Sequence, residues 1–288
     1  MEQQKKKLPI GIENFEVIRK EDFYYVDKTR LIAELLHNWG AVNLFTRPRR
    51  FEKTLNMSML EHFFSPNGEK GIFHGLEISK ETTLCQEYMG KYPVISVSFK
   101  GVDGRSYETA YQMAVQVMIE AAAKFYFLLD SEKLNAHDKG AYKELLDKHM
   151  DESVLSNSLK LLSGMLEKHF ATKVILLVDE YDVPLAKAYG NGYYDPMLSL
   201  LRNLLGQALK TNNSLKFAVL TGCLRISKES VFTGLNNLKV LTISDERFDE
   251  YFGFTDKEVR KLLEYYDVAD HYDTVKKWYD GYQFGIFL

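Results

Sequence analysis

The stretch AVNLFTRPRRFEKT, residues 41–54, joins a short apolar run to a polar loop and to the start of a helix. Residues 41–46 are mostly apolar, as in a buried strand. Lys53 and Thr54 then open a stretch, residues 53–64, whose apolar side chains have helical spacing. This is the placement of a phosphate-binding loop, in which backbone N–H groups surround phosphates, a Lys reaches the outer phosphates and a Thr holds Mg²⁺.

The loop lacks the glycines of the usual pattern. GxxxxGK[ST] would place them at positions 47 and 52, where this chain has Arg47 and Glu52. A Lys-Thr pair after a basic run is also typical of a solvated helix start. RRFEKT therefore leaves both interpretations open, and a second element has to decide between them.

That second element is VILLVDEYD, residues 174–182, an apolar run that ends in Asp179 and Glu180. In P-loop ATPases the first acid of such a pair supports Mg²⁺ and the second polarises the attacking water. Acids at a strand end are also commonly just solvated. Their position downstream of the Lys-Thr pair favours the ATPase interpretation.

A third element is the apolar run 215–221, which continues into TGCLRISK, residues 221–228. A cationic group at the tip of the strand beside the acidic one can sense the outer phosphate. Arg225 is the candidate for this role. The alternative is a surface ion pair of Arg225 with Asp182 or Glu229.

The whole chain alternates short apolar runs with helical stretches, which predicts an α/β fold with a mostly parallel sheet covered by helices on both faces. From Asp245 onward the sequence predicts helices only, one of them opened by a capping box at Thr255. The predicted strands are residues 41–46, 92–99, 173–179, 215–221 and 238–243, and the predicted helices are residues 53–64, 107–129, 139–169 and 196–210.

Six blocks, taken in this order, resemble the bacterial AAA-ATPase-like family from about Leu8 to Gly285. They are LPIGIENF, DFYYVDKTRLIAELL, LFTRPRRFEKTLNMSMLEHFF, VILLVDEYDVPL, TGCLRISKESVFTGLNNL and WYDGYQFG. The resemblance implies an ASCE-type P-loop NTPase core, residues 8–244, and a small C-terminal helical extension, residues 245–288. Members often continue into a PD-(D/E)XK nuclease-like domain. This chain ends three residues after Gly285, so we expect neither that domain nor DNA cleavage.

The resemblance also implies a site for ATP and Mg²⁺. Lys53 would bind the β- and γ-phosphates, Thr54 and Asp179 would hold Mg²⁺, Glu180 would activate water and Arg225 would act as sensor. The predicted nucleotide-binding loop comprises Arg47, Pro48, Arg49, Arg50, Phe51, Glu52, Lys53 and Thr54.

Glu52 stands where members of the family usually have glycine, in RPRRFGKT. A glutamate there adds bulk and negative charge where the backbone approaches phosphate, and a positive φ would strain it. Two consequences are open: Glu52 weakens or abolishes ATP binding and hydrolysis, or it pairs with Lys53 or Arg50 and turns aside. We expect Glu52→Gly to raise nucleotide affinity.

Composition excludes several other classes of protein. A formal charge of −3 gives no overall field toward nucleic acid, and the basic loop alone does not establish a nucleic-acid groove. The two cysteines lie far apart, the seven histidines have no metal spacing, and no apolar run is long enough to span a membrane. We therefore expect a cytoplasmic protein without a disulfide framework, a zinc site or membrane contact.

The rival interpretation is a non-catalytic interaction module that keeps the P-loop architecture and binds protein or nucleic acid. Asp179 and Glu180 favour an ATPase, whereas Glu52 favours the rival. Many AAA-type ATPases form rings, so a protein partner or a homo-oligomer stays open, and no arginine is assigned to a neighbouring subunit. Contact with nucleic acid is implied only by the family's association with nucleases.

Overall fold

The computed structural model describes residues 4–38, 40–223, 231–232 and 235–279. Its five strands are β1 (Val42–Thr46), β2 (Val94–Ser98), β3 (Val174–Asp179), β4 (Leu215–Gly222) and β5 (Leu238–Leu241). Its α-helices are α1 (Phe15–Lys20), α2 (Arg30–Asn38), α3 (Lys53–Phe64), α4 (Thr82–Tyr88), α5 (Tyr107–Ala123), α6 (Ala136–Glu144), α7 (Glu152–Phe170), α8 (Val183–Asn191), α9 (Tyr194–Leu209), α10 (Asp256–Tyr265) and α11 (Tyr272–Tyr279).

The strands form one parallel sheet in the order β2-β3-β4-β1-β5. Strand β4 lies between the strand that enters the predicted phosphate loop and the strand that ends in the two acids. Because all the strands run the same way, the carboxyl ends of β1, β3 and β4 meet at one edge of the sheet. The predicted α/β fold with a parallel sheet is confirmed.

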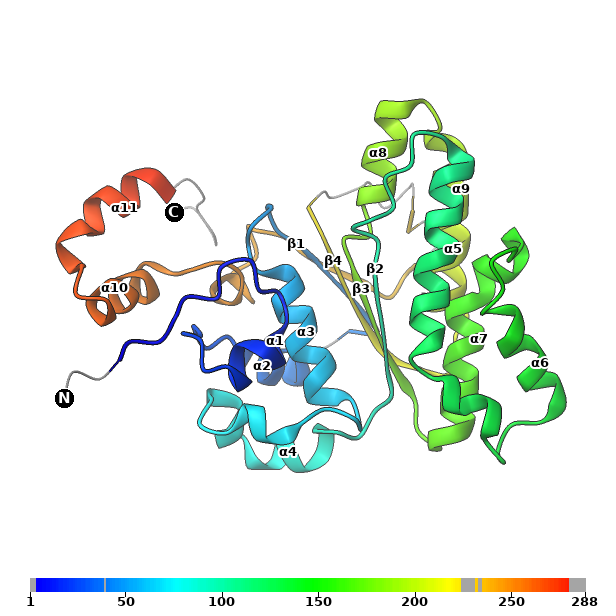
Figure 1. Cartoon of the computed structure of the whole chain (residues 1–288), viewed down its shortest axis with the longest axis horizontal. Coiled ribbons are helices and arrows are strands. Elements are labelled where there is room, and N and C mark those ends of the chain that lie inside the picture. Colours follow the sequence, from blue (N-terminus) through cyan, green and yellow to red (C-terminus); the bar gives the residue numbers. More distant parts are fainter. Residues whose placement is uncertain (1–3, 39, 224–230, 233–234, 280–288) are drawn as a thin grey trace.

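Helices cover both faces of the sheet (Figure 1). Alternate residues of each strand enter different cores: Val42 and Leu44 pack with the apolar faces of α5, α7 and α9, whereas Phe45 packs with those of α1, α2 and α3. A strand buried on both faces needs apolar residues at every position, which is why these strands read as continuous apolar runs.

Two predicted helices are shorter than expected. The stretch 139–169 is two helices, α6 and α7, because the side chain of Asp151 accepts a hydrogen bond from the Val154 N–H and begins a new helix there. The stretch 107–129 ends its α-helix at Ala123 and continues as a 3₁₀ turn over Tyr126–Asp130.

Helices α10 and α11 project to one side of the sheet (Figure 1). The predicted capping box opens α10: the Glu258 N–H donates to Thr255 Oγ1, and the Thr255 N–H donates to the Glu258 carboxylate. Neither helix has a buried residue. The division of the chain at residues 244/245 stays a prediction. Among the described residues, no helix is long and apolar enough to cross a membrane.

Candidate functional site

The loop between β1 and α3 starts at the carboxyl edge of the sheet and has unusual backbone conformations. The Arg47 N–H donates to the carbonyl of Gly222 at 3.0 Å, which fixes the start of the loop beside the end of β4. Arg50 and Glu52 then have φ of 67° and 52°, in the left-handed region that favours glycine. Glu52 is the N-cap residue of α3 and has a left-handed backbone conformation. This conformation explains why related proteins usually have glycine at this position.

Lys53 begins α3 and turns its ammonium group back onto the loop. Nζ donates to the carbonyls of Pro48 at 2.8 Å and Arg47 at 3.2 Å, and lies 3.4 Å from Cys223 Sγ. The residue is only 5% exposed. The lysine is therefore held at the centre of the loop by neutral acceptors, which a phosphate oxygen would outcompete because its bond to an ammonium is charge-assisted.

Thr54 and Asp179 are the two predicted Mg²⁺ ligands. They are 125 residues apart in the sequence but lie in direct contact. Thr54 Oγ1 donates to Asp179 Oδ2 at 2.7 Å, and Thr221 Oγ1 on the intervening strand β4 donates to Oδ1. Mg²⁺ is commonly held by one or two carboxylates, a hydroxyl, substrate phosphates and water. The two oxygens fit that donor set, although no described group of three His, Cys, Asp or Glu residues forms a closed metal cage.

Glu180 follows Asp179 in a backbone conformation with φ 52°. Burial raises the pKa of its carboxyl group, and the charges of Asp179 and Asp182 act in the same direction, against Lys100 and Lys53. A raised pKa makes a carboxylate a stronger proton acceptor at neutral pH. Arg50, Glu52 and Glu180, all with positive φ, line one cavity. Strained backbone of this kind is common at functional sites.

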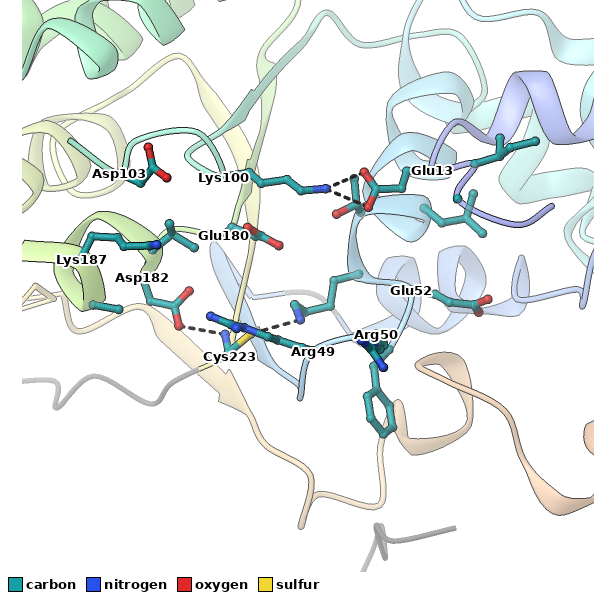
Figure 2. A pocket seen from close by; sticks show the side chains of 18 of the residues that line it. Glu13, Arg49, Arg50, Glu52, Lys100, Asp103, Glu180, Asp182, Lys187 and Cys223 are labelled. Carbon is teal, nitrogen blue, oxygen red and sulfur yellow. Dashed lines mark hydrogen bonds and ion pairs between the residues drawn. The ribbon is translucent and has the colours of Figure 1, made fainter. Parts of the chain in front are cut away.

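The cavity has a volume of about 760 Å³, which suits a small-molecule ligand. Figure 2 shows Arg49 near Asp182 and Cys223, with Glu180 between them and Lys100. The described lining residues come from the N-terminal segment, the loop, the end of β2, the acidic strand end and α8: Pro9, Gly11, Ile12, Glu13, Arg49, Arg50, Phe51, Glu52, Lys53, Thr54, Leu55, Lys100, Asp103, Glu180, Asp182, Val183, Ala186, Lys187 and Cys223.

Comparison with known proteins identifies the family of the chain. Residues 9–232 match the family described as Predicted AAA-ATPase. The chain belongs to this family. It is also 29% identical, over 297 aligned residues, to an uncharacterized protein in the vnfD 5' region of Azotobacter chroococcum mcd 1. The alignment covers 96% of the chain but 49% of that relative, so the chain spans about half of the relative's length. No solved structure matches the chain.

Most of the predicted loop lines the cavity, but Arg47 does not. Its guanidinium group is fully buried and donates to the carbonyls of Leu241 at 2.8 Å and Phe248 at 3.3 Å, with its carbon 5.0 Å from the Phe252 ring centre. Burial lowers the pKa of Arg47 to about 10, so it stays charged at neutral pH. Arg47 holds the segment after β5 against the loop and is not among the described residues that line the cavity.

The other predicted positions divide into three groups. Arg49, Arg50 and Phe51 line the cavity, and Pro48 contributes its carbonyl to Lys53. Arg225 lies outside the described residues, so its role stays a prediction. Sequence reasoning missed two residues that line the cavity, Glu13 and Lys100. Glu13 lies in the block LPIGIENF, which carries the family resemblance, but no role was predicted for it. Lys100 directly follows the second predicted strand.

The Glu52 side chain turns away from the acidic side of the cavity. Figure 2 shows it pointing away from Glu180 and Asp182. Its electrostatic neighbours are instead Lys28 and Glu258: burial raises the pKa of Glu52 to about 7, Lys28 opposes the rise and Glu258 adds to it. Glu52 thus turns aside, but toward Lys28 and not toward the predicted Lys53 or Arg50.

Glu52→Gln is expected to make the unfolding free energy of the ligand-free protein depend less on pH. With a folded pKa of about 7 against 4.5 for the free group, Glu52 is protonated more readily in the folded protein. Its contribution to stability is therefore full below pH 4.5 and is lost as pH rises toward 7. Relative to the glutamine variant, the parent should lose about 2 kcal/mol of unfolding free energy between pH 5 and pH 8.

Urea denaturation of both proteins at several pH values measures this difference. Titration of all other groups cancels in the comparison, because both chains share them. Glu21→Gln, which removes an exposed carboxyl group outside the cavity, is the control for the loss of one surface charge. Parallel curves for the parent and Glu52→Gln would show that the Glu52 carboxyl group is not buried.

Proposed function

We propose that this chain binds ATP with Mg²⁺ in the cavity and hydrolyses it, at a rate that Glu52 reduces. The observation that carries the proposal is the 2.7 Å contact between Thr54 Oγ1 and Asp179 Oδ2, with Lys53 at the start of the same helix. These three side chains come from segments more than 120 residues apart and meet at one sheet edge. That is the set of groups a triphosphate and its metal require.

The loop and α3 would bind the phosphates. Lys53 would exchange the Arg47 and Pro48 carbonyls for phosphate oxygens, and the N-terminus of α3 would direct backbone N–H groups and the positive end of its dipole at them. Thr54 and Asp179 would hold Mg²⁺, which when bound neutralises charge on the phosphates.

Glu180 would then act as general base. Its carboxylate would take a proton from a water molecule while the water oxygen forms a bond to the γ-phosphorus and the bond to the β–γ bridging oxygen breaks, releasing ADP and phosphate. Burial and the charge of Asp179 raise the pKa of Glu180, which suits a proton acceptor. Glu52 would oppose this reaction by its strained backbone and by negative charge beside the phosphates when it is ionised.

The alternative, a non-catalytic module that binds protein or nucleic acid, is favoured by Glu52 alone. The basic loop does not support a nucleic-acid groove, because Arg47 is buried away from the surface. A homo-oligomer or a protein partner is compatible with either proposal. The two functions differ in one property that can be measured, which is binding of ATP·Mg²⁺.

Calorimetry with ATP·Mg²⁺ on the full chain tests the proposal. We expect binding by the parent, loss of affinity by at least about 100-fold in Lys53→Ala, and a gain of about three- to tenfold in Glu52→Gly. Lys173→Ala, which removes a lysine outside the cavity, is the matched control. No heat with either the parent or Glu52→Gly would leave the interaction module as the function.

Cys223 provides an independent readout of the same binding. Its sulfur lies 3.4 Å from Lys53 Nζ and lines the cavity, whereas Cys85 does not. In a Cys85→Ser background, ATP·Mg²⁺ should slow labelling of Cys223 by a thiol reagent by about tenfold, since a ligand covers it. Labelling at the same rate with and without ATP would place the nucleotide elsewhere.

A further inference from the structure

Lys100 lies beside Glu180 because of the sheet's register. Ser98, the last residue of β2, pairs with Asp179, and the Phe99 N–H donates to the Asp179 carbonyl at 3.0 Å. The chain therefore leaves the sheet next to the acidic strand end, and Lys100 is the first residue after this anchor. Its side chain runs past Glu180 and across the cavity (Figure 2).

On the other side of the cavity Lys100 meets Glu13, from the N-terminal segment before α1. Nζ donates to both carboxylate oxygens of Glu13 at 2.9 Å. The two side chains are 55% and 54% exposed. An ion pair so exposed contributes little to stability, because water screens it, so a stronger anion can replace its carboxylate at small cost.

The end of the cavity around Glu180 carries carboxylates and cations. Glu13, Asp103 and Asp182 join Glu180 there, Arg49 and Lys187 lie near Asp182 (Figure 2), and Lys53 is held by the loop carbonyls. The hydrogen bond to Glu13 raises the pKa of Lys100, and the charges of Glu180 and Asp179 add to the rise. Lys100 is therefore a cation that these carboxylates hold in place, at the end where the proposed base acts.

We propose that Lys100 distinguishes ATP from ADP by exchanging the Glu13 carboxylate for the outermost phosphate group. The inference rests on the proposed function, because it takes Glu180 to mark the end of the cavity where the γ-phosphate lies. ATP places an additional anionic group there and ADP does not. Lys100 then binds ATP through a charge-assisted hydrogen bond that ADP cannot form, and Glu13 competes for the same cation in the free protein.

The test is calorimetry of the full chain with Mg²⁺ and either ADP or the β,γ-imido analogue of ATP. Lys100→Gln should weaken binding of the analogue about tenfold and change ADP affinity by less than about twofold. Lys100→Arg should keep the discrimination. Glu13→Gln should strengthen binding of the analogue about threefold, because it removes the competing carboxylate. Lys124→Gln is the control, since it breaks a similar exposed pair with Glu61 outside the cavity.

The opposite signs of the Lys100→Gln and Glu13→Gln effects separate this role from a structural one. If the ion pair only anchors the N-terminal segment, both substitutions remove the same contact and weaken both nucleotides alike, which would overturn the inference. Equal losses for the analogue and ADP in Lys100→Gln would also overturn it while leaving the proposed function intact. A parent chain that binds neither nucleotide would contradict the proposed function itself, and the role of Lys100 with it.

Discussion

Glu180→Gln is expected to reduce ATP turnover by at least about 100-fold, because an amide cannot take a proton from water. ATP affinity should change by less than about threefold, since Lys53, Thr54 and Asp179 supply the contacts to the phosphates and Mg²⁺. The substitution keeps the size of the side chain and the backbone at φ 52° meets the same strain with Gln as with Glu. A loss of turnover therefore reports the lost proton acceptor and not a displaced loop.

Steady-state phosphate release and calorimetry on the same two proteins measure this prediction. Glu108→Gln, at an exposed first-turn position of α5 outside the cavity, is the matched control and should keep full turnover. Measurement in the Glu52→Gly background raises the starting rate, so that a 100-fold loss stays within range. Turnover that survives Glu180→Gln would exclude Glu180 as the base and direct attention to Asp103 or Asp182 in the same cavity.

Sequence reasoning predicted the sheet, and which strand ends share one edge, because both depend on local pattern. A parallel strand buried on both faces must be apolar throughout, and Asp179 had to follow such a strand to reach the carboxyl edge. Thr54 begins a helix at the same edge, so contact between them follows from fold class and order along the chain. Their 2.7 Å hydrogen bond shows that these two residues meet, and their role as Mg²⁺ ligands stays a prediction.

The features that sequence reasoning missed depend on partners far along the chain. Arg47 looks like a phosphate ligand in RPRR, but its direction is set by carbonyls at Leu241 and Phe248, about 200 residues later. Glu13 enters the cavity only because α1 packs against α3. The break between α6 and α7 was missed for a different reason. Asp151 is a good N-cap residue, but the prediction used only the spacing of apolar residues, which continues across this position.

Lys28→Met is expected to reduce the free energy of unfolding by about 1.5–3 kcal/mol, the usual range for hydrogen bonds to a charged group, because the Glu258 side chain is 22% exposed and water screens part of the loss. Lys28 is 2% exposed, and Nζ donates to both carboxylate oxygens of Glu258 and to the Glu250 carbonyl at 2.6–2.7 Å. Without the lysine, the partly exposed Glu258 carboxylate loses its charge partner, while its bond to the Thr255 N–H still begins α10.

Urea denaturation followed by circular dichroism measures the loss, and a second variant identifies its cause. Lys28→Met combined with Glu258→Gln removes both charges and keeps a side-chain oxygen that can accept from the Thr255 N–H, so most of the stability should return. A double variant as unstable as Lys28→Met would show that packing of the lysine stem, and not the unpaired carboxylate, carries the effect.

Lys28→Met should also raise the pKa of Glu52 further, since Lys28 opposes the rise caused by burial. Glu52 then stays neutral at higher pH, so ATP affinity in Lys28→Met should persist to higher pH than in the parent. The buried lysine would in that case connect the helical extension to the charge of the phosphate loop.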